Sequence, residues 1–305
     1  MRLVRNRNVV FALALGCGLA AAGGARWTRP AALPALALVM TLSSLGIRGR
    51  VVRSARELGA PLVVGLGLTY LLLGGWFAGA SALFAHDPEV RDGLVLLAAV
   101  PPGVAVVPFT DMLGGDRGFS LLATVGTYLA ALVVLPAVGA AAWGEALVGP
   151  GRLLWVVGVL VLLPVAASRV LIGLGWAERL EPVRGALTNW SFFVVIYTVV
   201  GLNRPFLLGH PDAVVPLLAV AAGSTFGLGA GLLALGRRRG WGTPRTVSVV
   251  LLGTLKNYGL AAGLALALFP QRTALPAVVA GTVMIPYVIW LGRAIRRGGR
   301  PGTGL

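Results

Sequence analysis

Long apolar segments recur along the whole chain, separated by short stretches rich in Arg, Asp, Pro and Gly. A helix needs about 20 mostly apolar residues to cross a lipid bilayer. No strand-like alternation of apolar and polar residues competes with these segments, and only helices or closed barrels satisfy their backbone groups in lipid. We therefore predict an all-α integral membrane protein with ten transmembrane helices, over Val9–Gly24, Ala31–Ile47, Leu58–Phe84, Leu94–Leu113, Phe119–Trp143, Leu153–Gly173, Gly185–Leu202, Ala213–Leu235, Thr246–Phe269 and Leu275–Leu291.

The composition excludes the soluble classes of protein. Hydrophobic residues make up 57% of the 305 residues, charged residues only 12%, and the mean hydropathy is +0.87. A soluble domain carries about 25% charged residues, so a soluble enzyme, a nucleic-acid-binding domain and a disordered protein are poor interpretations. The single cysteine, Cys17, excludes an intrachain disulfide and a cysteine-based metal site. We expect no cofactor.

The basic charge is explained by membrane topology. The chain has 26 Lys and Arg residues against 10 Asp and Glu, a net charge of +16. With ten helices both termini lie on one side, and 19 of the 26 basic residues fall on that side. Cytoplasmic loops carry such an excess, so we predict cytoplasmic termini in a bacterial-type inner membrane. The expected partners are membrane lipids and a transported substrate, with no nucleic acid.

Two predicted helices contain breaks near their centres. The fourth carries Pro101, Pro102, Gly103 and Pro108 within eight residues, and proline removes a helix hydrogen bond. The ninth carries the most polar cluster of the ten segments, between two glycines: Gly253, Lys256, Asn257 and Gly259.

The two broken helices lie five segments apart. Broken helices in corresponding positions indicate an inverted-repeat transporter and its binding site. We predict two five-helix repeats of opposite orientation, residues 1–150 and 151–305, with the discontinuous fourth and ninth helices crossed. The stretch from Arg2 to Ala25 imitates a signal peptide, but removing it would destroy the five-plus-five arrangement, so we interpret it as the first helix.

The two breaks carry motifs of a known family. The fourth-helix motif is Pro101-Pro102-Gly103, followed by Gly115-Asp116, Ser120 and Thr124, and the ninth-helix motif runs from Lys256-Asn257 to Ala262. In both motifs and in the ten-helix layout the chain resembles the bile acid:sodium symporter family, within a wider group that includes arsenite and auxin efflux carriers. The resemblance implies a core of helices 3–5 and 8–10 that moves against a panel of helices 1, 2, 6 and 7. Our leading hypothesis is a secondary carrier of a small organic anion that works by alternating access.

Most sodium ligands that the resemblance implies are absent. Valines stand at positions 106 and 107, where the family has a Ser-Asn pair, and Leu252 stands in place of a shared Glu. Lys256 replaces a Gln, and Thr69 falls near a third-helix Gln, while Ser120 and Thr124 remain as hydroxyl ligands. Sodium needs several oxygen ligands, and an ammonium repels it. We expect a carrier that is not sodium-coupled in the usual way, with the coupling ion, sodium or proton, left open.

Lys256 is the sole lysine and the strongest candidate for function. A charge in the membrane centre costs about 2.5–3.5 kcal/mol on insertion scales. Lys256 either replaces sodium, binds an anionic substrate, exchanges a proton, or is structural and bonds unwound carbonyls. Asn257 is either a ligand or a cap of the broken helix. The positive N-terminal ends of half-helices favour an anionic substrate.

The remaining candidates are hydroxyl residues and one acid. Ser120 and Thr124 are either ion or substrate ligands or bond their own helix backbone, and Thr254, Thr110 and Thr69 are weaker candidates of the same kind. Asp111 is a possible proton carrier or partner of Lys256; alternatively, it is a helix-end carboxylate near Arg117.

Other functions remain as alternatives. A sodium-dependent symporter with altered ion ligands and a non-transporting scaffold or channel fit the same helices. An intramembrane enzyme is disfavoured because no nucleophile–base pair, His/Glu cluster or carboxylate pair lies inside the ten segments.

Overall fold

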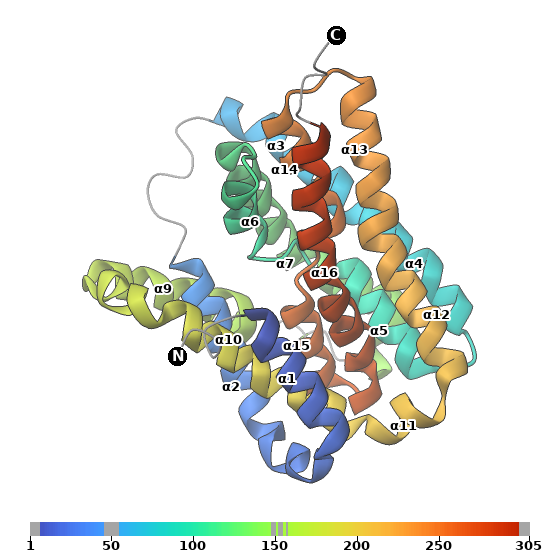
Figure 1. The fold of residues 1–305 in the computed structure, drawn as a ribbon. Coiled ribbons are helices and arrows are strands. Elements are labelled where there is room, and N and C mark those ends of the chain that lie inside the picture. Colours follow the sequence, from blue (N-terminus) through green and yellow to red (C-terminus); the bar gives the residue numbers. More distant parts are fainter. Residues whose placement is uncertain (1–6, 46–54, 148–150, 152–154, 157, 299–305) are drawn as a thin grey trace.

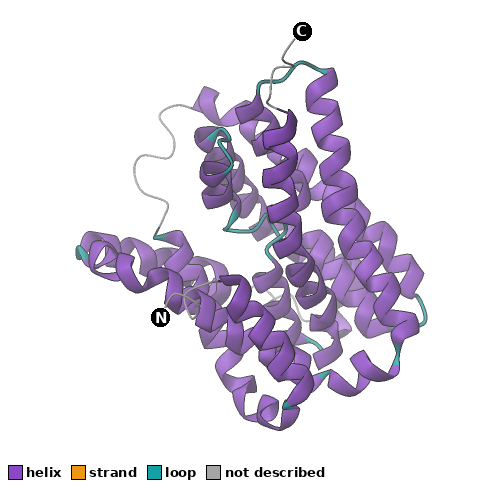
Figure 2. Cartoon of the chain, in the orientation of Figure 1, coloured by secondary structure: helices purple, strands orange, loops and turns teal. Residues whose placement is uncertain are grey.

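The computed structural model describes residues 7–45, 55–147, 151, 155–156 and 158–298, and its regular elements are helical (Figures 1 and 2). In chain order the elements are α1 Arg7–Ala20, η2 Ala22–Gly24, α2 Ala25–Ser44, α3 Ala55–Leu66, η3 Gly67–Leu73, α4 Gly74–Ser81, η4 Ala82–Phe84, α5 Pro88–Ala99, α6 Val106–Met112, α7 Arg117–Leu147, η5 Gly158–Leu162, α9 Leu163–Gly173, α10 Trp176–Leu202, α11 Arg204–Gly209, α12 Pro211–Ala222, η6 Gly223–Gly227, α13 Leu228–Arg238, α14 Thr243–Thr254, α15 Tyr258–Leu268, η7 Gln271–Ala274 and α16 Leu275–Gly298.

The predicted apolar segments lie on these helices, but only some helices are long enough to span a bilayer. Within the described residues five helices are long and apolar enough to cross a bilayer: Gly59–Phe84, Arg117–Gly144, Trp176–Leu202, Pro211–Arg238 and Gln271–Arg296. The pair Val9–Ala20 and Ala22–Ser44, bent by 92°, counts as a sixth if it is one span. The ten crossings and the inverted repeat therefore stay predictions.

Several helices begin earlier than hydropathy predicts. We expected starts at Ala31, Leu94 and Gly185, and these were wrong: α2 begins at Ala25, α5 at Pro88 and α10 at Trp176. In α5 the Asp87 side chain accepts a hydrogen bond from the Val90 amide, and proline follows it at the first helical position. Such caps set where a helix starts, whereas hydropathy finds only its apolar part.

The helices pack in two groups (Figure 1). Helix α10 packs along α1 and α2, and α9 packs against α2 and α10. In the other group α3 packs with α7, α4 with α5, α13 with α14, and α12 with α16. The two groups meet where α2 contacts α15 and α10 contacts α16 and η7.

The breaks predicted in the fourth and ninth segments are confirmed, and they lie against each other. The chain is non-helical between α5 and α6 and between α14 and α15. An antiparallel β-bridge joins Pro102 to Lys256. The Gly103 amide donates to the Leu255 carbonyl at 3.3 Å, and the Asn257 amide donates to the Pro101 carbonyl at 2.9 Å. Each break thus satisfies backbone groups that the other exposes.

Three residues predicted at the hinges lie inside helices. Pro108 is in the first turn of α6, where an amide has no helical partner and proline is tolerated. Gly253 is in the last turn of α14 and Gly259 in the first turn of α15. A Cβ on Gly253 would lie 2.6 Å from the Leu232 side chain, so this glycine permits close helix packing.

Two of the three described π-helical segments lie in the predicted helices directly before the broken ones. η3 interrupts the third predicted segment and η6 the eighth. These segments occupy corresponding places in the two proposed repeats. The Trp76 indole, on α4, donates to the Val220 carbonyl on α12, which joins the two segments directly.

The two backbones approach so closely at Gly103 that a larger side chain there should destabilise the protein. A Cβ at Gly103 would lie 3.0 Å from the Lys256 carbonyl oxygen, a backbone atom that cannot rotate away. Gly103→Ala should therefore destabilise the protein by about 1–3 kcal/mol through overpacking, measured as a lower melting temperature in detergent.

Gly79, on α4, is the matched control because a Cβ there meets nothing within 4 Å. Gly79→Ala should be neutral or slightly stabilising, because a helix with alanine at an interior position is about 0.5–1 kcal/mol more stable than one with glycine there. Equal melting temperatures for the two variants would show that the crossing is not tightly packed.

Candidate functional site

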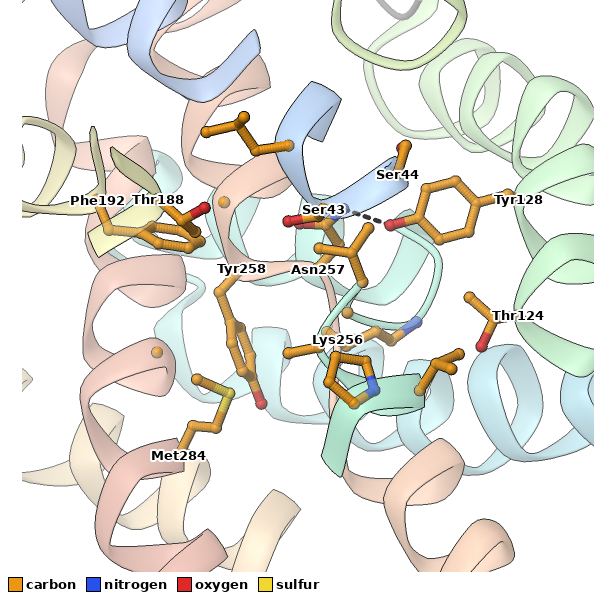
Figure 3. A pocket seen from close by; sticks show the side chains of 18 of the residues that line it. Ser43, Ser44, Thr124, Tyr128, Thr188, Phe192, Lys256, Asn257, Tyr258 and Met284 are labelled. Carbon is orange, nitrogen blue, oxygen red and sulfur yellow. Dashed lines mark hydrogen bonds between the residues drawn. The ribbon is translucent and has the colours of Figure 1, made fainter. Parts of the chain in front are cut away.

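A cavity of about 690 Å³ lies between the two groups of helices (Figure 3). The crossing forms one end of it, with Gly103, Lys256 and Asn257 in its lining. Apolar and aromatic side chains, among them Phe192 and Met284, line the sides. The predicted candidates in the lining are Gly103, Pro108, Asp111, Thr124, Lys256, Asn257 and Gly259.

Lys256 is buried at the crossing, with 1% of its surface exposed. Its ammonium nitrogen donates to the carbonyl oxygens of Ala98, at 2.8 Å, and Val100, at 2.9 Å. The same nitrogen lies 5.0 Å from the centre of the Tyr70 ring, within the range of a cation–π interaction. No ion pair joins Lys256 to an acidic side chain within the described part of the chain.

The sequence explains why these carbonyls need a donor. In a continuous helix the amide four residues later bonds each carbonyl. The residue four after Ala98 is Pro102, which has no amide hydrogen. The last carbonyls of a helix also form the negative end of its dipole. The ammonium of Lys256 therefore supplies both the missing hydrogen bonds and the complementary charge at the end of α5.

Asn257 makes a defined set of bonds at the start of α15. Its side-chain oxygen accepts from the Leu260 amide at 3.0 Å, so it is the N-cap of this helix. Its side-chain nitrogen donates to the Tyr128 hydroxyl at 2.7 Å and lies 3.4 Å from the Met40 sulfur (Figure 3). Asn257 thus links α15 to α7 and to α2.

Helix α7 contributes one polar wall of the cavity. Thr124 and Tyr128 are one turn apart and both line the cavity. Thr124 is 3% exposed, and its hydroxyl has no hydrogen-bond partner among the described residues. Tyr128 and Tyr70 were not predicted as site residues. For Tyr128 a signal existed, because it lies at i+4 from Thr124 on one helix face.

Other predicted hydroxyl ligands lie outside the cavity lining. Thr110 donates to Ser120 at 2.9 Å or to the Val106 carbonyl at 2.8 Å. Thr254 donates to the Val250 carbonyl and accepts from Tyr287 at 3.0 Å. Most of these hydroxyls bond neighbouring protein atoms and are not aimed at the cavity.

The Thr69 hydroxyl lies outside the cavity lining, and no metal-binding cluster is found among the described residues. Thr69 is fully buried in η3, and its hydroxyl has no partner among the described residues. Within those residues no group of three His, Cys, Asp or Glu side chains is placed to hold a metal ion.

Charged side chains also line the cavity. Asp111 forms an ion pair with Arg117 at 3.2 Å, and both side chains are about half exposed. Arg169 donates to the Ser44 carbonyl at 2.8 Å, and Arg184 pairs with Glu181 at 2.9 Å. Asp111 and these three arginines line the cavity, so its charged lining residues carry an excess of positive charge. The structure places Asp111 with Arg117 and not with Lys256.

Comparison with known proteins identifies the chain's family. The model of the Sodium Bile acid symporter family matches residues 33–208. The chain belongs to this family. It is also 23% identical over 250 residues to the uncharacterized protein YbaS of Bacillus subtilis, covering 80% of this chain and 81% of that protein. As a member of the sodium bile acid symporter family it is a membrane transport protein of the bile acid symporter type.

In this family member, three positions that the resemblance assigns to sodium ligands carry apolar side chains. Val106 and Leu252 are fully buried, and Val107 is 7% exposed. None of these side chains has an oxygen atom, and hard cations bind to oxygen. The surviving Ser120 is within hydrogen-bond distance of Thr110.

The two roles of Asn257 can be separated by substitution. Asn257→Ala removes the cap of α15 and should cost about 1 kcal/mol of stability, whereas Asn257→Ser keeps a capping oxygen but cannot reach Tyr128. We expect a lower melting temperature for the alanine variant only. A serine variant as unstable as the alanine variant would show that the bond to Tyr128, not the cap, stabilises the crossing.

Proposed function

We propose that this protein is a secondary carrier of a small organic anion that works by alternating access, with Lys256 in place of the coupling cation. The observation that carries the proposal is the buried ammonium of Lys256, hydrogen-bonded to the Ala98 and Val100 carbonyls at the helix crossing. A positive charge is fixed by the chain where the resemblance assigns a sodium site.

The fixed charge argues against conventional sodium coupling. Lys256 already bonds two backbone oxygens at the end of α5. A sodium ion next to the ammonium would be repelled, and Val107 and Leu252 offer it no oxygen. The crossing therefore keeps its cation throughout the transport cycle, and the carrier needs no sodium to assemble its site.

The charge of the cavity supports an anionic substrate. Lys256 lies at its crossing end, and Arg117, Arg169 and Arg184 line it with Asp111 as the acidic residue. Like-signed charges along a cleft raise the local concentration of the oppositely charged ligand. The apolar sides suit the organic part of such an anion.

Alternating access requires the closed side of the cavity to open. Under the predicted topology the arginine-lined end faces the cytoplasm, and the opposite side carries contacts between the two helix groups. The Asn203 side chain, after α10, donates to the Gln271 carbonyl, and the Gln271 side chain donates to the Leu202 carbonyl, both at 3.3 Å. We propose that α1, α2, α9 and α10 form the static panel and that the other group moves, breaking these bonds.

A second candidate is a sodium-dependent symporter with altered ion ligands. The hydroxyls of Thr69 and Thr124 favour it, because both are buried and have no partner among the described residues. Dependence of transport on sodium separates the two candidates.

Counterflow in proteoliposomes tests the proposal, with taurocholate first in a panel of radiolabelled organic anions. Under clamped voltage and pH, replacing choline chloride by sodium chloride should leave uptake unchanged. Lys256→Ala should reduce uptake at least tenfold, because the Ala98 and Val100 carbonyls lose their donor, and Lys256→Arg should retain part of it.

Membrane insertion of each variant is the control for these measurements. A sodium-stimulated wild-type uptake would favour the second candidate, and full activity of inserted Lys256→Ala would refute the role of the lysine. Absence of counterflow with every anion would contradict the carrier and favour a channel or scaffold.

The proposed closure predicts a shift in accessibility. In a Cys17→Ser background, a cysteine at the cavity residue Thr188 should react with an impermeant maleimide from the arginine-lined face. Replacing Asn203 and Gln271 by alanine removes the two hydrogen bonds between the helix groups, worth about 1 kcal/mol each, and the bond from Asn203 to the Val199 carbonyl within the panel. Labelling from that face should slow as the population shifts toward the opposite opening.

Arg204→Ala is the matched control, because Arg204 bonds the Leu19 carbonyl within the panel. It should leave the labelling rate unchanged. If the double variant and the parent protein are labelled at equal rates, the contacts of Asn203 and Gln271 do not hold the opposite side of the cavity closed.

A further inference from the structure

Two residues of α7 that line the cavity, Thr124 and Tyr128, carry hydroxyl groups without an acceptor among the described residues. The Thr124 hydroxyl is buried and unpartnered among the described residues. The Tyr128 hydroxyl has one partner there, the Asn257 side-chain nitrogen at 2.7 Å. In Figure 3 the Tyr128 side chain extends from α7 toward Asn257.

The bonds of Asn257 fix the direction of the Tyr128 proton. The Asn257 oxygen accepts from the Leu260 amide, so the group that meets Tyr128 is the amide NH₂, which can only donate. Tyr128 therefore uses its oxygen as an acceptor in this contact. Its own proton points elsewhere, and the described residues offer it no acceptor.

Two donors without acceptors on one wall of a cavity call for a ligand that supplies acceptors. Buried polar groups are almost always hydrogen-bonded, and an unsatisfied one carries a desolvation cost. Thr124 and Tyr128 are four residues apart and lie on one helix face, so a single group with two oxygens can meet both. Carboxylates and sulfonates are such groups, and hydrogen bonds to an ionised acceptor are stronger than neutral ones.

We propose that Thr124 and Tyr128 form the subsite that binds the acidic group of the transported anion and thereby select for it. This inference rests on the proposed function. Asn257 is the positioning residue of the subsite, because it holds the Tyr128 oxygen and leaves the proton for the ligand. Lys256 lines the same cavity, and two of the three ammonium hydrogens already bond the Ala98 and Val100 carbonyls.

The surroundings favour an anion over a cation at this place. A cation requires several oxygen acceptors, whereas Tyr128 already accepts a hydrogen bond from Asn257. Val107 and Leu129 are further lining residues without side-chain oxygen. The apolar side chains of Phe11, Phe192 and Met284 line the same cavity and suit the organic body of the ligand.

Equilibrium binding to the purified full chain tests the subsite, with labelled taurocholate as the anionic probe and methyl cholate as its uncharged counterpart. Tyr128→Phe should raise the Kd for taurocholate about tenfold, and Thr124→Val should raise it about fivefold. The affinity for methyl cholate should be the same in both variants as in the parent. Tyr197→Phe is the matched control, because its hydroxyl bonds the Ala21 carbonyl away from the cavity, and it should change neither Kd.

Each other outcome overturns a defined part of the account. Unchanged taurocholate affinity in both variants would overturn the subsite, and equal weakening of both probes would assign Tyr128 a structural role only. A sodium-induced rise in melting temperature that Thr124→Val abolishes would assign the hydroxyl to a cation. Failure of the parent protein to bind taurocholate or any other anion tested would instead contradict the proposed function.

Discussion

The architecture of this protein depends on how two broken helices satisfy their backbone groups in lipid. Membrane interiors offer no water to hydrogen-bond an exposed carbonyl, and Pro102 removes the amide that would bond Ala98. The ammonium of Lys256 supplies the donor, and the β-bridge between the breaks satisfies further groups. One side chain thus holds together segments more than 150 residues apart in sequence.

The same constraint arranges the cavity around it. Lys256 bonds the carbonyls at the end of α5, and we propose that the donors that meet the ligand are Thr124 and Tyr128 of α7, which lack acceptors among the described residues. Arg117, Arg169 and Arg184 line the cavity, and the helix groups also meet through Asn203 and Gln271. Under the proposed function, the positive charge of Lys256 at the crossing lets the site form without a bound sodium ion.

The sequence predicts the helical class and both breaks, because prolines, glycines and a lone lysine within apolar segments have few other structural uses. It does not predict the helix starts at Pro88 and Trp176, since caps and polar first turns carry no hydropathy signal. The place of Lys256 follows from sequence, but its bonds do not, because they depend on which carbonyls the partner helix brings near. Tyr128 was not predicted, although it lies four residues after Thr124 on the same helix face. Its hydrogen bond with Asn257 depends on how the two helices pack.

The central claim is that Lys256 occupies the place of a coupling cation. The most direct measurement is the melting temperature of the purified protein in sodium chloride and in choline chloride at equal ionic strength. A ligand that binds only the folded state raises this temperature, so the account predicts the same value in both salts. A sodium-specific, concentration-dependent rise in the parent protein would contradict it.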